Sequence, residues 1–165
     1  MAYPFSLVQN AKLVEVLAPA ADAAGRTGTA FSLKNAHKAY LVVHITQGNA
    51  ATVLLTPQQC TTVAGAGAKA IPATRIWANL DTAAAAELAD SLVRAADAVN
   101  YTTDAGVKNK IVVFEIDPSY LDVAGGFDCL RCNTGASNVA NITQIMAYLA
   151  PLRDGGATPP SARVD

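Results

Sequence analysis

Charged residues are scarce in this chain of 165 residues: they make up 15% of it, against about 25% in an average soluble domain. The formal net charge is −1, and no stretch of the sequence concentrates lysine and arginine. Because binding to a phosphate backbone requires a concentrated basic patch, we expect no nucleic acid partner. Hydrophobic residues reach 52%, with alanine prominent among them. This balance leaves surface for other subunits to cover and favours a protein that works in an assembly.

Long apolar runs are also missing. No run approaches the roughly 20 residues that a membrane-spanning helix needs, so we expect no membrane partner. Residues 1–6 lack the basic and apolar regions of a signal peptide, which predicts synthesis in the cytosol. The cysteines number three, an odd count, and nothing in the sequence indicates an oxidising compartment.

Short runs rich in β-branched and aromatic residues, separated by turn formers, dominate what is present. The predicted strands cover 12–17, 29–33, 39–47, 51–55, 75–80, 111–116, 127–134 and 141–149. Such close spacing of short strands predicts a mainly β fold, an antiparallel β-sandwich or jelly roll.

Two of these strands carry more specific expectations. The run 51–55 follows the turn pair Gly48-Asn49, so we expect it to pair back along 39–47 as a hairpin. The run 111–116 is apolar on both faces apart from Glu115, which predicts a central strand covered on both sides. Ala18-Pro19 is expected to end the first strand, and Pro57 is expected at an edge or a bulge.

The segment 83–98 is rich in helix formers, with leucines at helical spacing, whereas the surrounding pattern favours strand and loop. We expect one short helix or helical turn in part of 82–89, and one further helical turn at 119–123.

The sequence predicts one domain with two extended ends. The β-sandwich domain is expected over 11–153, between an N-terminal arm at 1–10 and a C-terminal tail at 154–165. Glycine and proline crowd the tail, so we expect it to form no packed element and to extend along a partner surface.

Cysteine and histidine are the first candidates for chemistry. Cys129 and Cys132 form a C-x-x-C, a spacing used by metal and redox sites. They lie in a predicted strand, where residues three apart point to opposite faces, so we interpret them as small apolar residues, one of them facing the core. His37 and His44 lack the His-x-His pair of a cupin-type metal site. We expect His44 near a subunit boundary or in a satisfied core position.

The remaining polar candidates have ordinary explanations. Gly65 to Lys69 lacks the residue order of a phosphate-binding loop and is interpreted as a plain loop. Asp117, Asp122 and Asp128 flank the turns of the C-terminal region and suit calcium or sugar chemistry if they lie together. Asp117 also suits a turn opener and Asp122 a cap or turn position, so we favour a structural role. We therefore expect no enzyme, and no catalytic, cofactor-binding or metal-binding residues.

One stretch resembles a known family. Residues 112–129 resemble small virion proteins of tailed bacteriophages, in which a V-F-x-I-x-P-x-x-L-D pattern, here at 113–122, is followed by G-F-D, here at 126–128. The resemblance extends over most of the chain and is weakest over 64–98. Further similar segments are 32–40, 45–50 and 158–162.

The resemblance implies a jelly-roll head decoration (cement) protein. Such a protein binds the outer surface of the capsid, bridges major capsid protein subunits and stabilises the shell. The resemblance further implies a homo-oligomer, dimer or trimer, on the capsid lattice of the virion, after synthesis in the host bacterial cytoplasm. We hypothesise that segments 1–10 and 154–165 make lattice or intersubunit contacts.

A function of a different class remains as an alternative. A β-sandwich of this size also suits a carbohydrate- or receptor-binding part of a phage fibre or tail. Sugar sites use exposed aromatic faces, and the candidates for such stacking are Trp77, Tyr101 and Tyr120.

Overall fold

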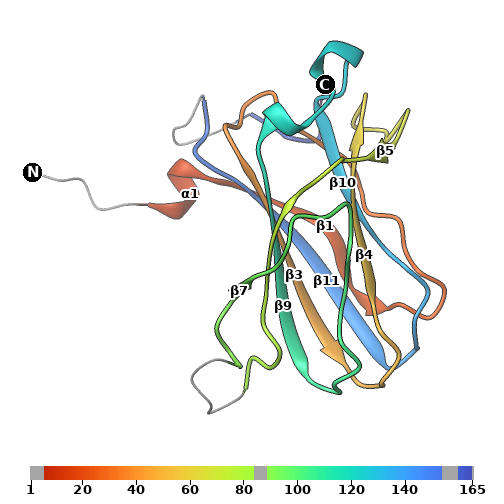
Figure 1. Ribbon diagram of the computed structural model, residues 1–165. Helices are drawn as coiled ribbons and strands as arrows, with labels where there is room; N and C mark the ends of the chain where they lie inside the picture. Colours follow the sequence, from red (N-terminus) through yellow and green to blue (C-terminus); the bar gives the residue numbers. More distant parts are fainter. Residues whose placement is uncertain (1–5, 84–88, 154–159, 165) are drawn as a thin grey trace, which may run out of the picture.

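The computed structural model describes residues 6–83, 89–153 and 160–164. In these residues, two antiparallel sheets pack face to face across one core (Figure 1). Sheet A has the order β1 (Lys12–Ala21), β11 (Asn141–Leu149), β3 (Ala39–Gln47), β9 (Asn109–Ile116), β6 (Arg75–Ala78) and β7 (Val93–Arg94). Sheet B has the order β2 (Phe31–Ser32), β10 (Cys129–Thr134), β4 (Leu54–Cys60) and β5 (Lys69–Ala70), with β8 (Tyr101–Thr102) also paired to β4. The predicted antiparallel β-sandwich is confirmed.

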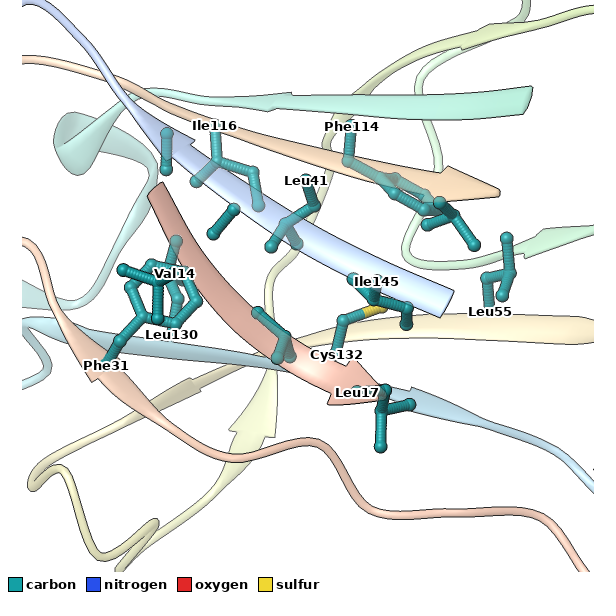
Figure 2. Close-up of a cluster of buried hydrophobic side chains, with 14 of the residues drawn as sticks. Val14, Leu17, Phe31, Leu41, Leu55, Phe114, Ile116, Leu130, Cys132 and Ile145 are labelled. Atoms are coloured by element: carbon teal, nitrogen blue, oxygen red, sulfur yellow. The ribbon is translucent and has the colours of Figure 1, made fainter. Parts of the chain in front are cut away.

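The core lies between the sheets and follows from strict alternation along the longer strands. Every second residue of β3, β9 and β11 is buried, because successive side chains of a strand point to opposite faces. Figure 2 shows side chains such as Leu41, Phe114 and Ile145 of sheet A in one cluster with Leu55 and Leu130 of sheet B. All five are fully buried. Each such side chain contributes about 1.5–3 kcal/mol to folding.

The predicted hairpin between 39–47 and 51–55 is wrong. β3 pairs with β11 and β9, whereas the return strand begins at Leu54 and belongs to sheet B. The chain crosses from sheet A to sheet B after Gln47, at the end of β3. The buried side chain of Gln47 holds the connecting segment by donating to the carbonyl oxygens of Ala51, at 3.3 Å, and Asp104, at 2.9 Å. Val53 then enters the core with no exposed surface. These contacts carry the chain from one sheet to the other.

Two prolines lie within strands at sites that tolerate them. β1 continues through Pro19 to Ala21, so its predicted end at Ala18-Pro19 is wrong. β1 is an edge strand with register shifts on either side of Leu17. Pro19 lies within the second shift, so the N–H that proline lacks is not missed by a regular hydrogen-bond ladder. Pro57 lies in β4 between the residues paired to β8 and those paired to β5, so one side of β4 is unpaired there, as at an edge.

The helical segments are short. α1 (Leu7–Asn10) occupies the end of the predicted N-terminal arm. The predicted turn at 119–123 is replaced by two 3-10 helices, η1 (Pro118–Tyr120) and η2 (Val123–Gly125). The helix expected within 82–89 falls mainly on 84–88, which lie outside the described residues, while Thr82 and Ala83 lie in a turn.

Part of the predicted tail packs on its own domain. Ala162 is 7% exposed and belongs to the core cluster. The backbone N–H of Ser32 donates to the carbonyl oxygen of Ala162 at 2.8 Å. The Arg163 guanidinium donates to the carbonyl oxygen of Ala30 at 3.1 Å. The expectation of an unpacked tail is therefore wrong for residues 160–164. The domain boundaries at 10 and 153 stay predictions.

A buried lysine stabilises one end of the sandwich. Lys110 is 1% exposed and its ammonium group donates to Gln47 Oε1 at 2.9 Å and to the carbonyl oxygens of Asp104 and Gly106 at 2.9 and 2.7 Å. Thr103 Oγ1 also donates to Gln47 Oε1, at 2.9 Å. A buried cation persists only when its donors are satisfied, and here they are.

We predict that Lys110→Met lowers the free energy of unfolding by about 1–3 kcal/mol, because buried carbonyl oxygens lose their donor. Urea unfolding measures this. The control is Lys108→Met: this side chain is 58% exposed and its ammonium group pairs with Asp81 at 3.2 Å, so its effect should stay within about 0.5 kcal/mol. Equal effects of the two variants would contradict the assignment.

Candidate functional site

The outward side of sheet A is unusually apolar for an antiparallel sheet. Such sheets commonly bury one face and present polar residues on the other. Here the outward positions of the four neighbouring strands β1, β11, β3 and β9 include many apolar side chains, all exposed or partly exposed. We call this set the outer face: Leu13, Tyr40, Val42, Ile111, Val113, Ile142, Met146 and Tyr148.

Strand register makes the outer face continuous around Val42, whereas the polar cross-strand pair Gln144 and His44 separates Ile142 from the rest. Met146, Val42 and Val113 are successive cross-strand partners, and Tyr148 pairs with Tyr40 one step along the same strands. The prediction that 111–116 form a central strand is thus right. The prediction that both faces of this strand are covered is wrong. In the described residues only the inward side is buried, and the outward Ile111 and Val113 keep partial exposure.

A shallow groove crosses this face beside α1. Its volume is about 320 Å³. The lining residues are Leu7, Ala11, Tyr40, Val42, Val113, Tyr148 and Ala150. Aliphatic side chains and tyrosine rings offer contact area with few hydrogen bonds to fix a small ligand. An apolar patch of this kind is a candidate interaction surface.

Charged residues border the outer face near the end of β9. Glu115 accepts a hydrogen bond from the Lys38 ammonium group at 2.5 Å, and Arg75 lies 3.6 Å from the same carboxylate oxygen. The Lys38 hydrogen bond lowers the pKa of Glu115, and Glu115 in turn raises the pKa of Lys38. An apolar centre with a charged border is the usual composition of a protein–protein interface.

The lowered pKa of Glu115 makes its contribution pH-dependent. A carboxylate with a lowered folded-state pKa stabilises the fold above its ordinary value of 4.5, and this stabilisation is lost as the pH falls through the folded-state pKa. We predict that Glu115→Gln costs about 1 kcal/mol or less at pH 7. Thermal unfolding from pH 7 to pH 2 should show this deficit shrinking toward zero at the acid end. A deficit that is independent of pH would contradict the ion pair.

Cys129 and Cys132 lie on opposite faces of β10, as predicted. Cys132 belongs to the main core, where burial raises its pKa to about 12. Cys129 belongs instead to a small separate cluster with Ala30 and Cys60. The two residues of the C-x-x-C therefore do not form one site.

The histidines and the aspartates are dispersed. His37 and His44 are both exposed, so the buried alternative for His44 is wrong. Asp117 accepts the N–H of Ser119 at 2.9 Å, and Asp122 accepts the N–H of Gly125 at 3.0 Å, which are the cap positions that we favoured.

The other polar candidates also have structural roles. Lys69, the last residue of the predicted loop, lies in β5 and donates to the Asp122 carboxylate at 2.6 Å. Asp128 lies 3.6 Å from the ammonium group of Lys34. Among the described residues, no three or more histidine, cysteine, aspartate or glutamate side chains are placed to hold a metal ion.

The three candidate sugar-stacking residues lie on different elements. Trp77, in β6, is half-buried and has the Arg94 guanidinium 5.7 Å from its ring centre. Tyr101, in β8, packs against the core, and this burial raises its pKa. Tyr120, in η1, also packs against the core and borders a different groove from the one that Tyr101 lines. The structure does not gather the three side chains into one stacking platform.

No family model, curated protein or solved structure matches this chain. In the part of the chain that the structure describes, no helix has the length and apolar character to cross a membrane. The resemblance to small virion proteins of tailed bacteriophages stays a prediction.

Proposed function

We propose that this protein is a bacteriophage capsid decoration protein that binds the outer surface of the head through the outer face of sheet A. In this proposal it bridges neighbouring major capsid protein subunits and stabilises the shell. The observation that carries the proposal is the uncovered apolar outer face. The segments that resemble phage virion proteins supply the identity of the partner.

The composition of β9 supports a partner on this face. Residues 111–116 of this strand are apolar on both sides apart from Glu115, a pattern typical of strands that are covered on both faces. Sheet B covers the inward side, and the outward Ile111 and Val113 stay partly exposed. A partner seated there would complete the burial that this sequence pattern favours.

The energetics favour a repeated lattice over a single strong contact. Burying one valine or leucine contributes about 1.5–3 kcal/mol at most, whereas association costs an estimated 4–15 kcal/mol in lost freedom of motion. Binding therefore needs several outer-face side chains at once. On a symmetric shell, one body that contacts two neighbouring subunits adds the two contributions, and many modest sites give a durable assembly.

The fold suits such a mechanical role. Two sheets share one packed core, and the polar side chains at the Lys110 end are satisfied within the domain. A closely packed interior resists compression and transmits load. In the proposed role this block would tie capsid subunits together without changing shape.

We predict that the double variant Val42→Glu, Val113→Glu lowers the affinity for purified heads by at least tenfold. The two residues are direct cross-strand partners in the centre of the outer face, so two carboxylates there would be buried without partners on binding. Cosedimentation with heads that lack the protein measures the affinity, and circular dichroism checks that the fold is retained.

The matched control is Val139→Glu, which changes a valine that is 70% exposed and lies in a turn, outside the strands of the outer face. It should bind heads like the unchanged protein. Two results would contradict the proposal: unchanged binding by the double variant, or a double variant that becomes monomeric yet still binds heads. The second result would assign the face to self-association.

A further inference from the structure

The register of sheet B places two cysteines directly opposite each other. Cys60 ends β4, and its cross-strand partner is Cys129, the first residue of β10. The neighbouring pair, Leu130 and Gln59, points into the sandwich, so the cysteines share the opposite, outward side of the sheet. All three cysteines of the chain are present as thiols.

Cross-strand geometry brings the two thiols within reach of a disulfide. Directly opposite residues of an antiparallel pair have Cα atoms about 4.5 or 5.5 Å apart, and disulfides form at about 4.4–6.8 Å. The Cβ atoms of such pairs lie about 4.5–5.5 Å apart, slightly more than the roughly 3.5–4.5 Å of a relaxed bridge. A bond at this position therefore needs only a small inward movement.

A loop covers the pair. Both cysteines are fully buried, in a cluster with Ala30 and with the partly buried Val63 and Ala68 of the β4–β5 connection. This cover is separate from the main core, which lies on the other side of the sheet.

Two backbone hydrogen bonds of the covering loop are internal to it. Thr61 N–H donates to the carbonyl oxygen of Ala66 and Gly65 N–H to that of Thr62, each at 2.9 Å. Gly65 and Gly67 take the left-handed backbone conformation that such a tight loop requires. The loop can therefore lift without breaking the pairing of β4 with β10, and local opening of this kind costs less than global unfolding.

The surroundings set the reactivity of Cys60. Burial raises the pKa of its thiol, and the nearby Arg131 guanidinium opposes that rise. Cys129 Sγ lies 3.3 Å from Asp128 Oδ1, to which it donates. Because the thiolate is the reactive form, exchange is slow while the loop is closed and accelerates when it opens.

We propose that Cys60 and Cys129 form a redox-modification site, which a small disulfide such as glutathione disulfide converts into a cross-strand bridge. The Cys60 thiolate attacks one sulfur of glutathione disulfide, forms a mixed disulfide and releases one glutathione thiolate. The Cys129 thiolate then attacks Cys60 Sγ, closes the protein disulfide and releases the second glutathione thiolate. The protein loses two protons and two electrons, and one glutathione disulfide becomes two reduced glutathione molecules.

The bridge would join the two central strands of sheet B and close a loop of about 70 residues, which restricts the unfolded chain and stabilises the fold. This inference rests on strand register and burial, and it is independent of the proposed binding to a capsid.

The test is to incubate the full chain with glutathione disulfide at pH 8, then digest it without reduction and map the peptides by mass spectrometry. The expected product is one peptide pair linked through Cys60 and Cys129, with Cys132 as the remaining thiol. The oxidised protein should melt roughly 5–10 °C higher than the reduced protein, and dithiothreitol should reverse the change. Cys132→Ala should retain this linked product, whereas Cys60→Ser should lose both the product and the shift in melting temperature.

The contradictory outcomes are distinct. A bridge that includes Cys132, glutathione adducts alone, or no oxidation even in mild urea that promotes loop opening would each overturn the proposal. Because the principal measurement uses the unchanged chain, the test stays decisive even if a variant fails to fold.

Discussion

The burial of the inward side chains of β3, β9 and β11 against sheet B is the interaction on which the rest of the structure depends. Leu41, Phe114 and Ile145 have no exposed surface. Their strands β3, β9 and β11 are neighbours in sheet A and form its longest runs of paired residues. Once these residues are fixed inward, the alternation of a strand directs their neighbours outward. Many of the outward positions of these strands are apolar as well. The register that buries the core residues therefore also places these apolar side chains on the outer face.

Local pattern was sufficient to predict the strongest strands. The predicted bounds 39–47 and 141–149 agree with β3 and β11, since both segments combine β-branched residues with regular alternation. The pairing of strands was less accessible. The predicted hairpin failed because the buried Gln47 side chain and Val53 direct the chain into the other sheet, and these contacts join residues far apart in sequence. No local signal near Ala162 predicted that it packs against the core.

At the candidate sites too, local pattern predicts which way a side chain faces but not which residue from another strand lies beside it. Sequence spacing drew attention to Cys129 and Cys132, and alternation predicted correctly that they face opposite ways. The pairing of Cys129 with Cys60 depends on the register of β4 against β10, which spacing along the chain does not specify. The apolar outward side of β9 is visible in the sequence, but the predicted cover on both sides is wrong for the described residues, where Ile111 and Val113 stay partly exposed. Only a three-dimensional arrangement distinguishes a strand that is covered on both faces from one that is covered on a single face.

The central claim is that this chain covers a capsid lattice, and the most direct measurement is its copy number per purified phage particle. Quantitative mass spectrometry against the major capsid protein supplies this ratio. The account predicts a ratio near one or a simple fraction of it, amounting to hundreds of copies per head. A few to a few tens of copies would place the chain in a neck, tail or fibre, and its absence from particles would contradict the virion role altogether.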